Sequence, residues 1–199
     1  MIYSIVAIGD PVLKTKAKNL SATLPASDLQ QLIADMFETM YSANGVGLAA
    51  PQIGKSVRLF VMDSTPMVEV DEEDREEGEE LEPPLKRAFL NPVMVNETGE
   101  EWGFEEGCLS IPGVRELVMR PADIVLRYED ESRQVHEEAF SGMAARIIQH
   151  EYDHLEGILF TDKLSGFKKQ LLKGKLARIS KGEAKHDYRM KFAGENRRR

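Results

Sequence analysis

The sequence has one cysteine, no long apolar run and no secretory signal pattern, and each of these absences excludes a class of structure. Cys108 is the one cysteine among 199 residues, so no disulfide can form within the chain. No apolar run approaches the roughly 18 residues that a membrane-spanning helix needs. The first residues lack the basic start and the long apolar stretch of a secretory signal. We therefore expect a cytoplasmic protein with no membrane segment.

What the chain does contain is enough apolar sequence for a core, together with unevenly placed charge. Apolar residues make up 42% of the chain, and its length favours one domain over residues 1–199. Ten of the residues from Glu69 to Glu82 are Asp or Glu, whereas residues 163–199 hold thirteen of the 26 Lys and Arg. The net charge of −8 therefore describes neither region. We expect residues 63–86 to form an acidic, mobile insert and residues 181–199 a basic C-terminal tail.

Apolar residues recur at helical spacing in three segments, which predicts helices over residues 27–42, 143–155 and 165–180. The apolar positions of the last helix are Phe167, Leu171, Leu172 and Leu176. A loop of small residues is expected over 48–54. Short β-branched runs predict strands over 57–62, 88–95, 114–119, 124–128 and 134–140. The predicted fold class is α+β, with antiparallel β-sheets around the central helix 143–155 and with a C-terminal helix.

The central helix carries an H-E-x-x-H pattern. His150 and His154 are four residues apart, so both imidazoles lie on one helical face and can reach a single metal ion. Glu151 lies beside them, where it can act as a base on a metal-bound water. A solvated helix face with two histidines is the simpler interpretation. Ile147 and Ile148 argue against it, because they place the pattern next to the core.

A catalytic site of this type needs a third protein ligand. Glu156 follows His154 too closely to reach the same metal, and Glu183 and His186 lie in a charged segment beyond another helix. Cys108 is the better candidate, because a thiolate binds soft or borderline metals well. Two alternatives remain for this cysteine, namely a small buried apolar residue and a nucleophile with a histidine base.

Three segments together resemble the peptide deformylases. Residues 45–52, GVGLAAPQ, are similar to the G-x-G-x-A-A-x-Q motif of that family. Residues 106–110, EGCLS, match its E-G-C-x-S motif, and residues 150–154, HEYDH, match its H-E-x-D-H motif. The motifs occur in the family's order, and the resemblance extends from the amino terminus to about residue 180.

This resemblance implies a metal-dependent hydrolase of protein biosynthesis, which removes the formyl group from the N-terminal formyl-methionine of nascent proteins. The implied metal ligands are Cys108, His150 and His154, with water as the fourth. Glu151 is implied as the general base and acid, and Gln52 and the backbone N–H of Leu109 as the oxyanion donors. The implied substrate-binding residues are Val46, Gly47, Phe104, Gly107, Met143, Arg146 and Ile147.

Several of these implied roles have plain alternatives. Gly47 lacks a side chain and would leave room for the substrate backbone, but an ordinary turn glycine explains it equally well. Glu106 and Arg120 would form an ion pair that supports the loop with Cys108, unless they are two unrelated solvated charges. A pocket residue such as Ile147 could equally belong to the core.

Two arguments about the identity of the metal lead to different ions. A thiolate, two imidazoles and water point to zinc, whereas the resemblance implies one Fe²⁺ ion per chain, which Zn²⁺, Ni²⁺ or Co²⁺ can replace. The implied partners are N-formyl-methionyl nascent peptides, and neither a membrane nor DNA is expected. The basic segment 181–199 could dock on ribosomal RNA, because clustered Lys and Arg attract phosphates, or could simply keep the chain in solution.

Two other functions stay open at this stage. A zincin-like endopeptidase would cleave internal peptide bonds and tolerate Cys108→Ser. A non-enzymatic metal-binding or ribosome-associated module would keep its metal in Glu151→Ala and lose nothing functional. Release of formate from a formyl-Met peptide separates the deformylase interpretation from both.

Overall fold

A computed structural model describes residues 1–67 and 83–193 of the chain. Residues 68–82 of the mobile acidic insert expected over 63–86, and residues 194–199 of the basic segment, lie outside the described residues. The ends of the expected insert, Asp63 and Lys86, belong to strands. In the described ranges, no helix is both long and apolar enough to cross a membrane. The α-helices are α1 (Ala26–Ser42), α3 (Gly142–Leu155) and α4 (Gly166–Ile179), and the short 3₁₀ helices are η1 (Pro11–Lys14), η2 (Ala50–Ile53) and η3 (Phe160–Lys163).

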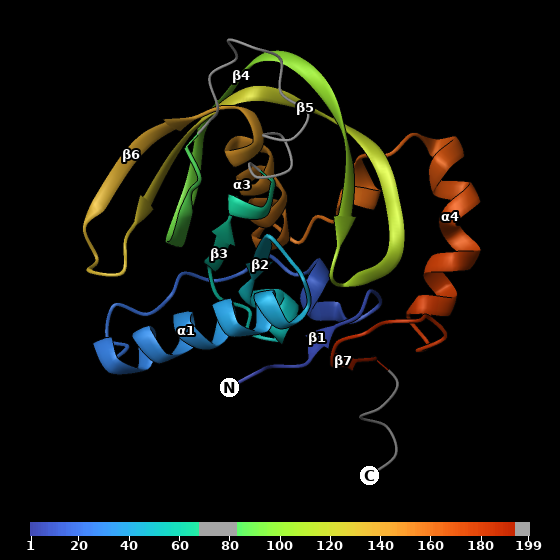
Figure 1. Ribbon diagram of the computed structural model, residues 1–199, viewed down its shortest axis with the longest axis horizontal. Coiled ribbons are helices and arrows are strands. Elements are labelled where there is room, and N and C mark those ends of the chain that lie inside the picture. Colours follow the sequence, from blue (N-terminus) through green and yellow to red (C-terminus); the bar gives the residue numbers. More distant parts are fainter. Residues whose placement is uncertain (68–82, 194–199) are drawn as a thin grey trace.

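The strands of the described ranges form two sheets, and the larger one packs around α3. Their bounds are β1 (Ile5–Val6), β2 (Gly47–Ala49), β3 (Leu59–Asp63), β4 (Lys86–Cys108), β5 (Ile111–Glu129), β6 (Val135–Phe140) and β7 (Met190–Lys191). Strands β2-β3-β4-β5-β6 form an antiparallel sheet in that order, and β1 pairs with β7 in parallel. In Figure 1, β4 and β5 arch over α3, α1 lies beneath it, and α4 stands at the outside. The predicted α+β class is confirmed.

Strands β4 and β5 are longer than the sequence pattern predicted. The predicted strands 114–119 and 124–128 belong to one strand, β5, and the predicted strand 88–95 continues to Cys108. The register between the two strands shifts in several places, one of them next to Pro121. Such bulges bend a strand and accommodate a residue without an N–H, so the pair can arch without ending. Residues 95–101 are exposed and mostly polar, and their lack of alternation hid the continuation.

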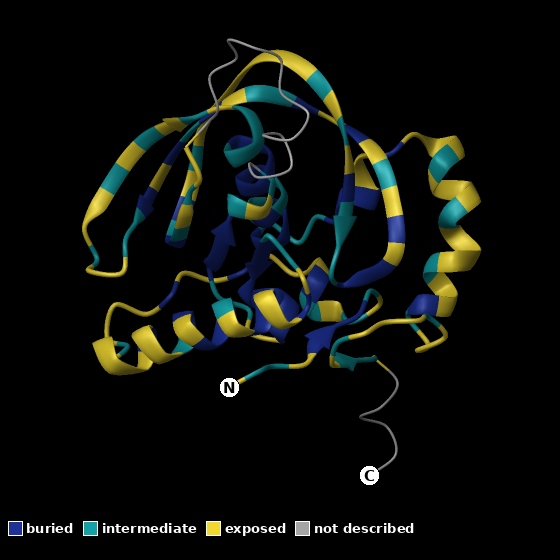
Figure 2. Ribbon diagram, viewed as in Figure 1, coloured by how far each residue is buried: buried dark blue, intermediate teal, exposed yellow. Residues whose placement is uncertain are grey.

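Helix α3 is buried at the centre of the molecule (Figure 2). Ile147, Ile148 and Leu155 are at most 5% exposed, and the helix packs against β2, β3 and β5. Each such side chain contributes about 1.5–3 kcal/mol when buried, so the helix is firmly held. After α3 the chain turns at Gly157, whose φ is 74° and where a Cβ atom would lie 2.8 Å from the carbonyl carbon of Lys14. Any other residue would be strained there.

Helix α4 is the most exposed of the helices (Figure 2). Of the four apolar positions predicted to define it, Leu172 and Leu176 pack against a hydrophobic cluster, whereas Phe167 and Leu171 are 74% and 66% exposed. Its most buried residue is Ile179, which is 2% exposed. The predicted bounds 165–180 hold to within one residue at each end. Helical spacing therefore located the helix but did not show which apolar residues it buries.

Three short strands, β1, β2 and β7, were not predicted. The segment 48–54, expected to be a loop, contributes to β2 and to the 3₁₀ helix η2. In the segment expected to be a basic tail, β7 pairs with β1, so that Met190 lies opposite Ile5 and Lys191 opposite Val6. Strands of two or three residues are too short to show a period of two, so the pattern could not reveal them. The β1–β7 pair holds the C-terminal segment against the start of the chain.

Candidate active site

The sulfur atom of Cys108 and the rings of His150 and His154 lie close together. Cys108 ends β4, and the two histidines lie one turn apart on α3. Cys108 Sγ lies 3.3 Å from Nε2 of His154, and ligand atoms of the three residues all lie within 4.8 Å of one another. One sulfur and two imidazole nitrogens form a donor set that suits zinc or iron. The three predicted ligands therefore form a possible metal site.

The two imidazoles have different surroundings. Nδ1 of His150 lies 2.9 Å from Oε2 of Glu106, which leaves Nε2 for a metal, as is usual for a ligating histidine with a carboxylate behind it. Burial holds the pKa of His154 well below its ordinary value, so its ring is neutral. Burial also lowers the pKa of His150, but Cys108 and Glu106 outweigh it and raise that pKa. Metal binding at His150 would then release a proton.

The predicted ion pair between Glu106 and Arg120 is confirmed. Arg120 donates from Nε and Nη2 to the two carboxylate oxygens of Glu106, at 2.6 and 2.9 Å, and from Nη1 to Asp153 at 2.7 Å. Burial alone would raise the pKa of Glu106, but Arg120 and His150 hold that pKa far below its ordinary value. Because the Glu106 carboxylate stays ionised, it can hold both Arg120 and the ring of His150. The ion pair of Glu106 and Arg120 therefore connects β4, which carries Cys108, with α3.

Arg146 also belongs to this buried network. Its Nη1 donates to Glu106 at 3.1 Å and its Nη2 to the carbonyl oxygen of Trp102 at 2.7 Å. Its guanidinium lies over the Trp102 ring, 4.2 Å from the centroid. The charged end of Arg146 thus has structural partners, which leaves its aliphatic stem as the part available to a ligand.

Glu151 and Gln52 present polar groups on the same side as the three ligand atoms. Burial raises the pKa of Glu151 to about 7, and its Oε2 is buried without a hydrogen-bond partner in the described part of the chain. The Gln52 Oε1 accepts the Ala49 N–H at 2.7 Å. This bond directs the Gln52 Nε2 toward Cys108 Sγ, 3.5 Å away, and Ser110 Oγ, 3.4 Å away. A carboxyl group of this pKa can exchange a proton near neutral pH.

Gly47 lies against the carboxylate of Glu151. A Cβ atom on Gly47 would lie 2.3 Å from Glu151 Oε1 and 2.7 Å from its Cδ. Contacts this short do not occur between unbonded atoms, so either Glu151 or β2 would have to move. The sequence suggested that this glycine leaves room for a substrate, and the structure shows a more immediate need, which is room for Glu151.

If Glu151 takes part in the reaction at this site, Gly47→Ala should lower kcat about 10²-fold, because displacing a reacting group by about 1 Å has effects of that size. Gly174→Ala is the matched control, since a Cβ at Gly174 has no heavy atom within 4 Å and should leave kcat unchanged. Steady-state kinetics with equal metal content in both variants measures the difference. A Gly47→Ala enzyme with normal kcat would show that the position of Glu151 is not critical.

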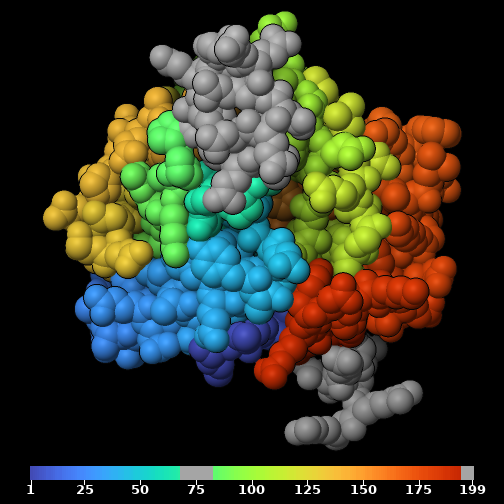
Figure 3. Space-filling model, viewed as in Figure 1, coloured from blue at the N-terminus to red at the C-terminus, as the bar shows by residue number. Residues whose placement is uncertain are grey.

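A cavity of about 510 Å³ opens beside these groups. Of the predicted site residues, His154 is the one that does not line the cavity; it lies behind the wall, 1% exposed. The others form its walls: Val46, Gly47, Gln52, Phe104, Gly107, Cys108, Leu109, Met143, Arg146, Ile147, His150 and Glu151. In Figure 3 this face shows a hollow between the cyan residues near 45 and the yellow-green β4–β5 arch.

The cavity also has lining residues that the sequence did not indicate. Arg115 comes from β5, and Lys185, His186, Asp187 and Tyr188 come from the C-terminal segment. Burial raises the pKa of Tyr188 to about 12, so its phenol stays protonated near neutral pH. No motif marks these positions. Residues 185–188 reach the cavity through the β1–β7 pairing, which the sequence pattern could not predict.

Comparison with known proteins agrees with this geometry. The family model described as polypeptide deformylase matches residues 2–170. The peptide deformylase of Christiangramia forsetii is 54% identical over 199 residues, covering 100% of both chains, and that of Cytophaga hutchinsonii is 52% identical, covering 96% of this chain and 98% of that protein. The crystal structure of a peptide deformylase from Legionella pneumophila superposes with a TM-score of 0.75 at 37% identity, covering 93% of this chain and 99% of that chain. The chain belongs to the polypeptide deformylase family of hydrolases.

Proposed function

We propose that this chain removes the formyl group from the N-terminal formyl-methionine of nascent peptides by metal-dependent hydrolysis. The observation that carries the proposal is the convergence of Cys108, His150 and His154 beside the buried carboxyl group of Glu151, at the wall of one cavity. Family membership supports the same reaction.

Within this proposal, Cys108, His150 and His154 hold a divalent metal, which supplies the Lewis acidity that makes water a nucleophile near neutral pH. Glu151 handles the proton. Its carboxylate accepts a proton as water attacks the formyl carbon and returns it to the departing amine, a cycle that a pKa of about 7 favours. The products are formate and a free amino terminus.

Two donors would stabilise the oxyanion that forms at the formyl oxygen. They are Nε2 of Gln52 and the backbone N–H of Leu109. The Gln52 amide is already oriented, because its oxygen accepts the Ala49 N–H. Donors that are fixed before the reaction stabilise developing charge without reorganising, and one such donor is typically worth about 10²–10³ in kcat.

The methionine side chain would occupy the apolar part of the cavity. The proposed contacts there are Val46, Phe104, Gly107, Met143, Ile147 and the stem of Arg146, all of which line it. Burying a methionine side chain is worth about 1.5–3 kcal/mol, enough to favour it over a polar residue. The peptide backbone would pass near Gly47, and we propose that residues 1–199 act as one catalytic domain.

For the metal itself we propose one Fe²⁺ per chain, with Zn²⁺, Ni²⁺ or Co²⁺ able to replace it. The mixed donor set of one sulfur and two nitrogens is compatible with each of these ions. Elemental analysis of protein purified under anaerobic conditions tests this choice, and a full complement of zinc with no iron would contradict it.

The test of the function is formate release from formyl-Met-Ala-Ser, measured beside cleavage of an internally quenched peptide that has no formyl group. The proposal predicts stoichiometric formate with a free Met-Ala-Ser product and no internal cleavage. Internal cleavage without formate would instead support a zincin-like endopeptidase. No turnover of either substrate by fully metal-loaded protein would support a non-enzymatic module.

We also propose that the chain works in the cytoplasm on nascent peptides and that its basic segment 181–199 docks on ribosomal RNA. The support is charge, since Lys and Arg outnumber acidic residues in that segment. Replacing Arg197, Arg198 and Arg199 with Gln should weaken co-sedimentation with ribosomes and make it less salt-dependent, without changing kcat on formyl-Met-Ala-Ser. Unchanged co-sedimentation would contradict docking through this end of the chain.

A further inference from the structure

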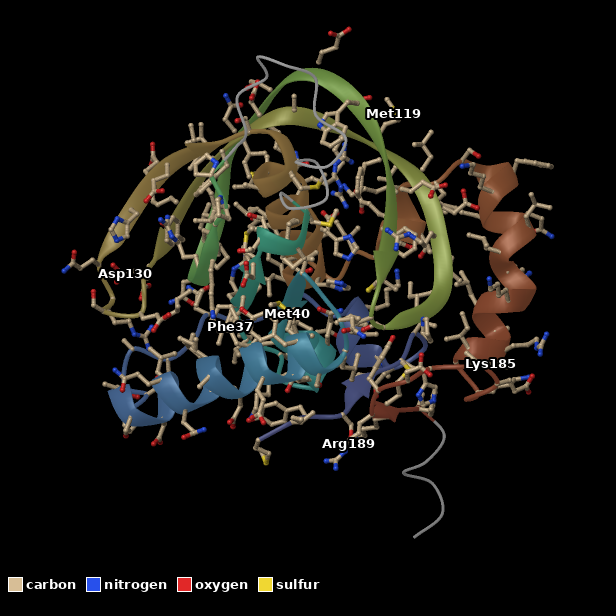
Figure 4. The ribbon with its side chains drawn as sticks, in the orientation of Figure 1. Phe37, Met40, Met119, Asp130, Lys185 and Arg189 are labelled. Carbon is tan, nitrogen blue, oxygen red and sulfur yellow. The ribbon has the colours of Figure 1, made fainter. Side chains whose placement is uncertain are left out.

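The C-terminal segment after α4 reaches the candidate active site. Residues 185–188 line the cavity, although they lie outside residues 2–170, to which the family model extends. Figure 4 labels Lys185, the first residue of this stretch, and Arg189, the residue that follows it. The segment is placed by β7, where the Ile5 N–H donates to the Arg189 carbonyl at 2.8 Å and the Ala7 N–H donates to the Lys191 carbonyl at 2.9 Å.

One contact of this segment reaches the turn that follows Cys108. The Tyr188 hydroxyl donates to the carbonyl oxygen of Leu109 at 2.7 Å. Leu109 and Ser110 form the two-residue turn between β4 and β5, because Cys108 pairs with Ile111. The ring of Tyr188 packs in the same hydrophobic cluster as the Leu109 side chain. A phenol that only walled the cavity would not need its hydroxyl directed at a main-chain oxygen.

The turn is also held from a second side. The Ile8 N–H donates to the Ser110 carbonyl at 2.9 Å, and the Gln52 Nε2 lies 3.4 Å from Ser110 Oγ. Both carbonyl groups of the turn, those of Leu109 and Ser110, are therefore anchored by donors from outside β4 and β5. Ile8 directly follows Ala7, whose N–H donates to the Lys191 carbonyl of β7, so the two anchors depend on the same β1–β7 contact.

Anchoring these carbonyl groups restricts the direction in which the N–H of Leu109 can point. Peptide units are planar, so a fixed Leu109 carbonyl fixes the whole peptide unit that follows Leu109. The preceding unit, which carries the Leu109 N–H and the main chain of Cys108, then moves only through the φ and ψ angles of Leu109. A donor for an oxyanion is effective when its direction is set before the reaction.

We propose that Tyr188 is a positioning residue for the deformylation site, acting through Leu109 to hold the oxyanion N–H in its working direction. The inference rests on the proposed function, in which that N–H is a donor. Because such a donor acts mainly in the transition state, its misplacement should lower kcat and leave KM nearly unchanged.

The experiment is Tyr188→Phe, which keeps the ring and removes the hydroxyl. We expect kcat for formyl-Met-Ala-Ser to fall about 3- to 10-fold, the equivalent of one neutral hydrogen bond, with KM, metal content and Tm close to those of the wild type. Tyr41→Phe is the matched control, since it removes a phenol that donates to Asp63 at 2.6 Å and involves no site residue. Its kcat should not change.

Amide hydrogen exchange gives a second readout that does not depend on activity. In Tyr188→Phe the amides of residues 109–111 should exchange faster, while the Ile5 amide, bonded to Arg189, stays protected because the β1–β7 pair survives. Wild-type kcat in Tyr188→Phe, or a loss of kcat that follows lost metal, would overturn the inference. If the wild-type protein itself released no formate, the proposed function would fail. Unchanged amide exchange at residues 109–111 in Tyr188→Phe would separately show that Tyr188 does not hold the turn.

Discussion

Replacing Glu151 with glutamine is expected to lower kcat for formate release about 10²–10⁴-fold while the protein keeps its metal. Glutamine has nearly the same shape as glutamate but cannot accept and return a proton. Glu151 is 4% exposed and burial raises its pKa to about 7, so it is the group at this site best suited to carry the proton. KM should change little, because proton transfer belongs to the transition state.

The control for this variant is Glu156→Gln. Glu156 follows α3 directly, accepts a hydrogen bond from Arg58 at 2.6 Å and does not line the cavity. Its replacement makes the same glutamate-to-glutamine change five residues away and should leave kcat within about twofold, although losing a partner of a buried arginine lowers stability. An equal loss of kcat in both variants would indicate a general electrostatic effect in place of a proton-transfer role for Glu151.

The second large effect is expected for Cys108→Ser. A neutral hydroxyl is a much weaker ligand than a thiolate for zinc or iron, so the variant should bind the metal poorly and lose more than about 10³-fold of its activity, since Lewis acidity is worth several kcal/mol. Elemental analysis after dialysis and the formate assay measure the two losses together. Glu151→Gln, which keeps all three ligands, serves as the comparison for metal content.

This variant also separates two interpretations of the site. An endopeptidase with ligands from His150 and His154 and a third ligand other than Cys108 would retain metal and activity in Cys108→Ser. Retention of both would therefore contradict the assignment of Cys108. In the structure the Cys108 sulfur lies 3.3 Å from Nε2 of His154, so we expect Cys108→Ser to lose both metal and activity.

The arrangement of side chains at the candidate site was more predictable than the bounds of the strands, for a physical reason. The spacing of His150 and His154 fixes their geometry once a helix forms, because residues four apart share a face. The buried apolar neighbours Ile147 and Ile148 made that helix recognisable. The pairing of Glu106 with Arg120 followed from the family resemblance. Local sequence was sufficient to predict the geometry of the two histidines, whereas the contact between Glu106 and Arg120 was predicted from the family motif.

What the sequence could not supply depends on contacts between distant segments. Pro121 and the exposed run 95–101 lie within long strands because register shifts accommodate them, and no local pattern encodes a bulge. The contact between Gly47 and Glu151 joins β2 to α3, so the need for glycine was visible only in three dimensions. Tyr188 reaches Leu109 through a parallel pairing of two-residue strands.

The buried network around Glu106 explains how two elements hold one site. Glu106 lies two residues before Cys108 on β4 and contacts the His150 ring on α3, while Arg120 bonds to both Glu106 and Asp153. Because the ionised carboxylate of Glu106 bonds to both Arg120 and His150, it fixes the position of β4 relative to α3. The distance between Cys108 and His150 is thus set by charge-assisted hydrogen bonds as well as by packing.

The most direct test of the account is X-ray absorption spectroscopy of the protein loaded with one equivalent of Zn²⁺. We expect one sulfur ligand at about 2.3 Å and two imidazole nitrogens at about 2.0–2.1 Å, with the sulfur signal absent in Cys108→Ser. A metal bound by nitrogen and oxygen alone in the unsubstituted protein would contradict the assignment of Cys108, His150 and His154 as its ligands.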